Sequence, residues 1–429
     1  MRIAIIGAGV GGMAAAYDLH RAGHEIIVFE AAKSVGGLAA GFKDPHWDWS
    51  VEQYYHHWFT SDSDILGLIK ELGLYEKVVF PHPKTVSYFK GKFYPLDSPL
   101  AAITFPGFSF LDMIRFGLVT AYLRYIAAWQ PLEKFTADEW IQRYYGKNLY
   151  NVLFQPMLEG KFGPHQKEVN MAWFWARFKT RTTVLGTYQG GFQAFADDFA
   201  AFLQNQGVKI NLETPVQQIN PCPGGILELV VNGQTWPFDR CLVTVSPALL
   251  ARMAPALPDS YLRGLLNLKS MGAVVMILAL RNQLSQEGYY WYTLPKSAGF
   301  PFLALVEHTN FLKPEFFGGD HIIYCGDYLD AGHENFSLSK EELQARILPS
   351  LTRFNPEFRP DWVRESWLFK TNYAQPIPLV NHSHNVPDLR TPIAGLFFAS
   401  MSQVYPWDRG TNFAVQIARR AAQRILEDK

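Results

Sequence analysis

The N-terminal segment constrains the fold of this chain more than any other part. Residues 2–6 (RIAII) are apolar and end at Gly7, which predicts a buried parallel strand. Residues 11–22 carry small side chains suited to a helix on a sheet, and residues 25–29 (EIIVF) predict a second buried strand. A strand, a helix and a strand within about 30 residues form a βαβ unit.

Glycines follow the first strand with the spacing G-x-G-x-x-G, at Gly7, Gly9 and Gly12. Gly7 permits the tight turn, Gly9 leaves bare backbone where a pyrophosphate approaches, and Gly12 lets the helix pack closely. The helix N-terminus directs unpaired N–H groups at the phosphates. The alternative is a glycine-rich turn in an ordinary α/β protein, but the strand before and the helix after favour a dinucleotide site.

An acid, Glu30, ends the second strand. Its carboxylate can accept hydrogen bonds from both hydroxyls of an adenosine ribose, and it would repel a 2′-phosphate. The dinucleotide is therefore expected to be FAD or NAD rather than NADP.

The residues after this acid distinguish the two cofactors. Gly36 and Gly37 follow Glu30 in a segment that resembles the extended fingerprint of a flavoprotein superfamily. That superfamily contains amine oxidases, protoporphyrinogen oxidases and phytoene desaturases, with UDP-galactopyranose mutases as relatives. Ser34 and Leu38 stand where the family usually has arginines, and a plain loop is the alternative reading of the glycine pair.

Three later segments share the resemblance: Thr214-Pro215-Val216, Thr244–Pro247, and a tail with the sequence GLFFASMSQVYPWDRGTNFAVQIARRAA. In the tail, Ser400-Met401 replaces the usual Gly-Asp pair, and no cysteine is present to attach a flavin, which implies FAD bound without a covalent bond. The resemblance implies cofactor contacts at Gly7, Ala8, Gly9, Gly11, Gly12, Glu30, Ala31, Ser34, Gly36, Gly37, Leu38, Val216, Ser246, Met401, Thr411, Asn412 and Phe413.

Residues 52–59 (EQYYHHWF) resemble the histidine-bearing loop that faces the flavin in this superfamily. Tyr55, His56 and His57 are therefore the candidate catalytic residues, since a histidine near a flavin can act as an acid or base near neutral pH. The alternative is that the histidines are packed in the structure. We expect no metal site, because adjacent histidines on a regular element cannot both face one ion.

Other candidates come from the same resemblance. Lys161 or Lys269 can supply the lysine that some amine oxidases place near flavin N5, although solvated lysines are the expected alternative for both. Tyr405 and Trp407 precede the last helix, where they form either an aromatic wall beside the flavin or part of the core.

These patterns predict an α/β protein with a discontinuous Rossmann-type FAD-binding domain and a second α+β substrate domain carrying a helical insert. The expected segments are FAD-binding residues 1–80, 189–262 and 386–429, a mostly helical insert at 81–188, and an antiparallel sheet at 263–385. Within the insert, residues 86–94 predict a hairpin turning at Lys90-Gly91. Residues 105–129 are apolar, and we expect a buried helix there, with peripheral contact to a membrane surface as the alternative.

Composition excludes several classes of partner. The 39 basic and 39 acidic residues balance, which argues against nucleic acid. Aromatic residues make up 15% of the chain and favour a fairly apolar small-molecule substrate. No stretch of 18 apolar residues occurs. The 3 cysteines form no motif, which fits a reducing cytoplasm.

We therefore expect an FAD-dependent oxidoreductase in which hydride passes from a substrate C–H bond to flavin N5. Two alternatives stay open. One is a non-redox flavoenzyme of the UDP-galactopyranose mutase type, for which Arg177, Lys179 and Arg181 would supply the basic cluster for a diphosphate. The other is a flavin-binding protein without turnover.

Overall fold

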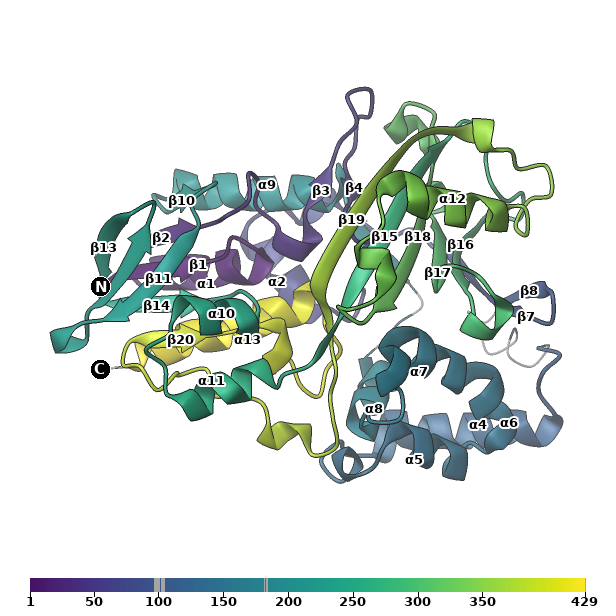
Figure 1. Cartoon of the computed structure of the whole chain (residues 1–429), viewed down its shortest axis with the longest axis horizontal. Helices are drawn as coiled ribbons and strands as arrows, with labels where there is room; N and C mark the ends of the chain where they lie inside the picture. The colour runs from purple at the N-terminus through teal and green to yellow at the C-terminus, as the bar shows by residue number, and fades with distance from the viewer. Residues whose placement is uncertain (96–100, 102–104, 181, 183, 429) are drawn as a thin grey trace.

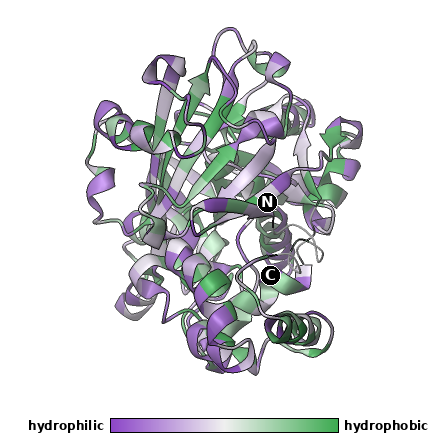
Figure 2. Ribbon diagram, turned by 90° about the vertical axis from the view of Figure 1, so that its right-hand side faces the viewer, coloured by the Kyte–Doolittle hydropathy of each residue, from purple (hydrophilic) through white to green (hydrophobic). Residues whose placement is uncertain are grey.

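The computed structural model describes residues 1–95, 101, 105–180, 182 and 184–428. Figure 1 shows a parallel sheet with its helices at one end of the molecule, a large sheet at the other, and a helical bundle beside the large sheet. In Figure 2 the middle of the large sheet is mostly hydrophobic, as expected for strands covered on both faces. No helix among the described residues is long and apolar enough to cross a membrane.

The parallel sheet has the strand order β10-β2-β1-β14-β20. Its strands are β1 (Arg2–Ile6), β2 (Glu25–Phe29), β10 (Lys209–Asn211), β14 (Arg240–Val243) and β20 (Leu396–Phe398). β1 pairs with β2 in parallel and α1 (Val10–Arg21) connects them, so the predicted βαβ unit is confirmed. Because the strands come from both ends and the middle of the chain, the predicted discontinuous Rossmann-type architecture is confirmed as well.

Alternation along the buried strands divides the core into two layers. Ile3 and Ile5 pack on one side with helices α1, α2 (Ser63–Glu71), α9 (Gly191–Asn205) and α13 (Thr411–Leu426). Ala4 and Ile6 pack on the other side, under an antiparallel sheet and two helices. These covering elements are β11 (Val216–Pro221), β12 (Leu227–Val231), β13 (Gln234–Phe238), α10 (Pro247–Met253) and α11 (Asp259–Leu266).

The large sheet has the order β19-β15-β18-β17-β16-β7-β8 and is antiparallel except where β16 meets β7. Its strands are β19 (Val363–Pro376), β15 (Ser270–Leu280), β18 (His321–Leu329), β17 (Ala304–Glu307), β16 (Tyr289–Thr293), β7 (Lys84–Phe89) and β8 (Lys92–Pro95). The predicted hairpin forms with positive φ at Lys90 and Gly91. Because β7 pairs with β16, this hairpin belongs to the sheet and not to the helical insert.

Each face of the large sheet has a different neighbour. Helix α12 (Lys340–Leu351) packs on one face. The other face packs on aromatic residues from the segment between Phe42 and Phe59. That segment and its neighbours form short pairs of strands: β3 (Gly41–Phe42) with β4 (Val51–Glu52), and β9 (Leu185–Tyr188) with both β5 (Trp58–Phe59) and β6 (Val78–Val79). The two domains therefore meet at this loop.

The predicted helices of the insert are present as α4 (Phe110–Ala121), α5 (Ala137–Tyr144), α6 (Lys147–Leu149), α7 (Gln155–Phe162) and α8 (Met171–Thr180). α4 continues into a π-helical turn, Tyr122–Ile126. The prediction of a buried helix at residues 105–129 is wrong, because no residue of α4 is buried. Only the side of α4 that carries Phe116 and Val119 packs against the bundle.

Candidate active site

The glycines between β1 and the first turn of α1 have different roles. Two of them are required by the backbone and the packing, and the third, Gly9, is not. Gly7 has φ +107°, and a Cβ on Gly12 would lie 2.0 Å from the carbonyl oxygen of Gly7. Gly9 differs: its φ of −70° and ψ of 171° suit any residue, and the nearest atom to a Cβ there would be 3.9 Å away. The space above Gly9 therefore fits a ligand that must approach the backbone closely.

The N-terminus of α1 is open toward that space. Gly9 is its N-cap residue and no side chain caps the helix, so first-turn N–H groups remain available to an anion. Gly11 instead faces α13, since a Cβ there would lie 3.1 Å from the carbonyl oxygen of Ala414. The second glycine pair lies against the first loop, where Gly36 donates its N–H to the Ala8 carbonyl at 2.9 Å. Ser34 and Leu38, in the same turn, are half-buried.

Glu30 lies beside this loop at the end of β2. Its carboxylate accepts hydrogen bonds from the backbone N–H groups of Ala8 and Ala32, each at 2.8 Å. Thr214 donates its N–H to the Glu30 carbonyl at 2.8 Å, which brings the start of β11 at Val216 to the same edge of the sheet. Ala31 is exposed in this turn. Glu30, the glycine loop and the start of β11 thus lie together, where an adenosine would bind.

Ser246 lies just beyond β14, at the same edge of the parallel sheet. Its hydroxyl accepts a hydrogen bond from Leu249 N–H at 3.4 Å and so caps α10. Met401 begins a short 3₁₀ turn after β20. The sequence could not show that the side chain of Ser246 already has a local partner.

The N-terminus of α13 is a second uncapped helix end. The Thr411 hydroxyl accepts a hydrogen bond from Trp58 Nε1 at 2.9 Å, and the side-chain Oδ1 of Asn412 accepts one from Asp64 N–H at 2.8 Å. Phe413 stacks on Trp407 with ring centroids 5.6 Å apart. These side chains face protein, whereas the first-turn N–H groups of α13 have no side-chain cap and remain suited to negative charge on a ligand.

Tyr55, His56 and His57 lie between the domains, in the loop that joins β4 to β5. The ring of Tyr55 contacts Trp291 edge-on at 4.9 Å and occupies the space that Gly326 leaves in β18. Burial lowers the pKa of His56 to about 4, so this imidazole is neutral at pH 7. The ring of His57 lies 5.2 Å from that of Phe59. The loop thus places an anchored tyrosine and two imidazoles under the large sheet.

Asp408 forms a buried charge cluster just before α13. Its carboxylate accepts hydrogen bonds from Lys161 Nζ at 2.7 Å, Arg177 at 3.1 Å and Trp173 Nε1 at 3.1 Å. Lys161 Nζ also lies 5.0 Å from the centroid of the Trp173 ring. The expectation that Lys161 is a solvated lysine is wrong, because only 12% of its side chain is exposed. Sequence analysis missed this cluster, although a charged pair, Asp408-Arg409, at a helix start was a visible signal.

The other basic residues that the sequence singled out are Lys269, Lys179 and Arg181, and those that the structure describes do not join this cluster. Lys269 is half exposed and lies 3.6 Å from a carboxylate oxygen of Glu168. Lys179 donates to the carbonyl of Arg124 at 2.9 Å, and Arg181 lies outside the described residues. Since Arg177 already bonds Asp408, the described part of the predicted basic cluster does not converge on one anion.

A small interior hollow lies beside the Asp408 cluster, lined in part by Met401, Tyr405, Trp407, Gln375 and Arg409. Arg409 donates to Gln375 Oε1 at 3.0 Å and to the Tyr328 hydroxyl, both on the large sheet. The Tyr405 hydroxyl donates to Glu133 at 2.9 Å. Tyr405 and Trp407 therefore line this hollow while also packing against the helical bundle.

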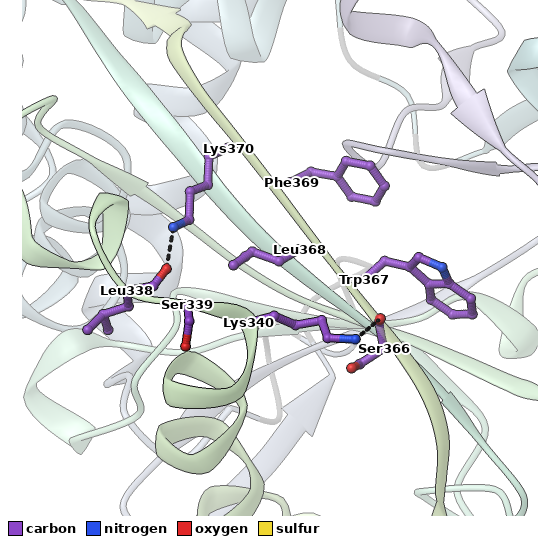
Figure 3. A pocket seen from close by; sticks show the side chains of 8 residues that line it. All are labelled: Leu338, Ser339, Lys340, Ser366, Trp367, Leu368, Phe369 and Lys370. Atoms are coloured by element: carbon purple, nitrogen blue, oxygen red, sulfur yellow. Dashed lines mark hydrogen bonds between the residues drawn. The ribbon is translucent and has the colours of Figure 1, made fainter.

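A larger hollow of about 560 Å³ lies between β19 and the start of α12, away from the glycine loop. Figure 3 shows Lys340 and Lys370 bonded to the backbone carbonyls of Ser366 and Leu338, while Trp367 and Phe369 point in the opposite direction. Its lysines already have partners, so we do not assign the active site to it. Among the described residues, no group of three His, Cys, Asp or Glu side chains could hold a metal ion.

Glu52 is a buried carboxyl group that makes the stability of the fold depend on pH. It accepts a hydrogen bond from Phe192 N–H at 3.0 Å, yet burial raises its pKa from 4.5 to about 7. Between pH 4.5 and 7, Glu52 therefore keeps its proton in the folded state and releases it in the unfolded state. The free energy of unfolding falls as the pH rises through this range.

Glu52→Gln is expected to match the wild-type free energy of unfolding at pH 4.5 and to exceed it above pH 7 by up to about 3 kcal/mol. Urea unfolding at pH 5 and pH 8 measures the difference, with Glu25→Gln at an exposed position as the control. An equal difference between Glu52→Gln and wild type at both pH values would contradict the assignment.

Fold and site together define an α/β protein whose parallel sheet carries the features of a dinucleotide site at its carboxyl edge, next to a second, mostly antiparallel sheet. The family model for flavin containing amine oxidoreductases matches residues 10–426, so the chain belongs to this family and is a flavin-dependent oxidoreductase. The predicted resemblance and fold class are confirmed.

Individual proteins that are similar to this chain agree with the family assignment. Flavin-containing amine oxidase B of Sus scrofa is 24% identical over 99% of this chain and 86% of its own length. A provisionally named protoporphyrinogen oxidase from Exiguobacterium sp. 255-15 has a solved structure with a TM-score of 0.79 and 17% identity, covering 100% of this chain and 99% of that one. Putrescine oxidase bound to putrescine has a TM-score of 0.68 and 18% identity, covering 100% and 99%. At such identities these structures show the fold alone.

Proposed function

We propose that the chain binds FAD without a covalent bond and oxidises a fairly apolar small molecule at a C–H bond. The observation that carries the proposal is the edge of the parallel sheet, where two uncapped helix N-termini, the open space above Gly9 and the acid Glu30 lie together. A dinucleotide with two phosphates and a ribose matches this set of groups. Of the cysteines, Cys241 and Cys325 are buried in the sheets and Cys222 lies in the loop after β11, which favours non-covalent binding.

The residues of this chain would hold the cofactor by backbone contacts. The N–H groups at the start of α1 would bind the pyrophosphate, and Glu30 would exchange its backbone partners for the ribose hydroxyls. Val216, at the start of β11, would lie against the adenine. The N–H groups at the start of α13 would stabilise negative charge on the pyrimidine side of the ring system.

When bound, the flavin supplies a hydride acceptor at N5 for a substrate C–H bond. The protein positions the substrate and excludes water, and the aromatic rings of Tyr55 in the β4–β5 loop and of Trp291 on the adjoining sheet face suit an apolar molecule. Neutral His56 can accept a hydrogen bond or a proton, and His57 is the second candidate for proton transfer. Lys161 would contribute as part of the Asp408 cluster rather than as a solvated amine.

The visible spectrum of the purified protein tests the cofactor, and heat or acid precipitation tests the linkage. Yellow protein that releases FAD into the supernatant is expected. Anaerobic bleaching by amines, porphyrinogens or polyenes would identify the substrate class. Bleaching by none of them, together with a spectral change on adding UDP-sugars to reduced protein, would favour the non-redox alternative.

His57→Ala is expected to keep the yellow colour and to lower the rate of anaerobic flavin reduction by about 10²-fold to 10⁴-fold, the usual range for loss of a general acid or base. Stopped-flow absorbance with the identified substrate measures this rate, and His82→Ala at an exposed position is the matched control. An unchanged rate would assign His57 to packing.

A further inference from the structure

The segment that carries the candidate histidines is held at both of its ends. The histidine loop, as we use the term, consists of residues 53–57, which connect β4 to β5 without regular structure of their own. A loop of this kind has few ladder hydrogen bonds, so its position depends on what its ends and its side chains contact. Those contacts therefore decide where His56 and His57 lie.

Glu52 holds the entry to the histidine loop. Its carboxyl group accepts a hydrogen bond from Phe192 N–H at 3.0 Å, in the first turn of α9. The Tyr324 hydroxyl donates to the main-chain carbonyl of Glu52 at 3.0 Å, and Gln53 donates its N–H to the carbonyl of Ala40 at 3.0 Å. The entry is thus tied to both domains by side-chain and backbone bonds.

Trp58 holds the exit from the histidine loop. Its side chain is fully buried, and its ring lies 4.7 Å from that of Phe192 and 5.5 Å from that of Phe195, both on α9. Its indole N–H donates to the Thr411 hydroxyl at 2.9 Å. A buried indole N–H needs an acceptor, and here the first residue of α13 supplies it.

The side chains at the start of α13 bond neighbouring segments and not their own helix. Gly410 is the N-cap residue and no side chain caps the helix, although Thr411 follows directly. The side-chain Oδ1 of Asn412 accepts hydrogen bonds from the N–H groups of Asp64 and Ile65, at 2.8 and 3.1 Å, in the first turn of α2. The N–H groups of the first turn of α13 thus stay available to a ligand, while its side chains hold the surrounding chain.

We propose that Thr411 is a positioning residue whose hydroxyl fixes His56 and His57 relative to the flavin site. His57 is the chain neighbour of Trp58, so a displaced indole would displace His57 directly. The His56 ring lies 5.8 Å from that of Phe192, on which Trp58 also packs. Thr411 thus offers its N–H to the cofactor and its hydroxyl to the loop, so one residue is the common reference point for both.

Hydrogen exchange of the full-length protein, followed by mass spectrometry of the peptide that spans residues 53–58, tests the hydrogen bond. Thr411→Val keeps the shape and the backbone N–H but leaves the indole of Trp58 without its acceptor. We expect exchange in this peptide to become at least about tenfold faster, because an unpaired buried donor favours open forms of the loop. Thr411→Ser retains a hydroxyl and should restore slow exchange.

Thr352→Val is the matched control, because Thr352 lies exposed at the end of α12, where its hydroxyl donates to the carbonyl of Pro349 at 2.8 Å. Trp58→Phe removes the same bond from its other side. If both groups act through one bond, the double variant Trp58→Phe with Thr411→Val should exchange about as fast as the faster single variant. Unchanged exchange in Thr411→Val, or additive effects in the double variant, would overturn the proposal.

The consequence for catalysis rests on the proposed function. With a substrate that bleaches the flavin, Thr411→Val should lower the limiting rate of anaerobic reduction at least about tenfold, since small misplacements of reacting groups are costly. The substrate concentration at half-maximal rate should change little, and Thr411→Ser should restore the rate. Fast loop exchange with an unchanged limiting rate would overturn the positioning role.

The visible spectrum of each variant reports on the cofactor separately. Loss of flavin from Thr411→Val with slow loop exchange would overturn the proposal, because it would assign the hydroxyl to the cofactor. A wild type that no substrate reduces would contradict the proposed function alone, since the exchange experiment needs no substrate.

Discussion

Gly9→Val is expected to yield folded protein without bound flavin. The backbone at Gly9 has angles that valine adopts readily, and the nearest atom to an added Cβ is 3.9 Å away, so the fold accommodates the side chain. The same side chain would fill the space through which a pyrophosphate reaches the N–H groups of α1. Cofactor binding should therefore fail while stability changes by less than about 1 kcal/mol.

The flavin-to-protein ratio from the visible spectrum, together with thermal unfolding of the cofactor-free proteins, measures both effects. Gly67→Val is the matched control, because a Cβ at Gly67 in α2 meets nothing within 4 Å. Gly12→Ala provides the contrast: its Cβ would lie 2.0 Å from the carbonyl oxygen of Gly7, so this variant should lose stability as well as flavin. Wild-type flavin content in Gly9→Val would contradict the assignment of the loop.

Local sequence patterns were sufficient for the nucleotide-binding half of the fold. A buried strand, a tight glycine turn and a helix are determined by residues within one or two turns of each other, so β1, α1 and β2 formed as predicted. The same holds for the hairpin at Lys90-Gly91, where both turn residues take positive φ. What the pattern could not show was that this hairpin pairs with β16, which comes much later in the chain, so that Tyr289 lies opposite Lys84.

The errors involve contacts that hydrophobic periodicity does not encode. The apolar pattern of α4 correctly indicated a helix, but periodicity does not tell whether each apolar face is covered by protein, and the prediction of burial was wrong. Lys161 was expected in solvent, but its partner Asp408 lies 247 residues away in the chain. Buried ion pairs of this kind depend on the packing of distant helices and are therefore absent from single-sequence patterns.

Asp408→Ala is expected to lower the free energy of unfolding by about 3–5 kcal/mol, the usual cost of removing one partner from a buried charge cluster. The carboxylate holds Lys161 from α7 and Arg177 from α8 in a site where these side chains are only 12% and 18% exposed. Without it, the two cations would lie close together beside the Trp173 ring with little water to screen them. Differential scanning calorimetry or urea unfolding measures the loss.

Two further variants separate charge from packing at this cluster. Glu168→Ala removes a carboxylate that pairs with Lys269 at the surface, and it should cost less than about 1 kcal/mol. Replacing the cluster as a whole, with Lys161→Met, Arg177→Met and Asp408→Leu together, should recover most of the lost stability, since apolar side chains of similar volume often substitute for buried ions.

The triple variant would still bind flavin if the cluster serves only to join α7 and α8 to the start of α13. Loss of flavin from a stable triple variant would instead show that the charges of the cluster act on the cofactor, and a small effect of Asp408→Ala alone would show that the cations find other partners.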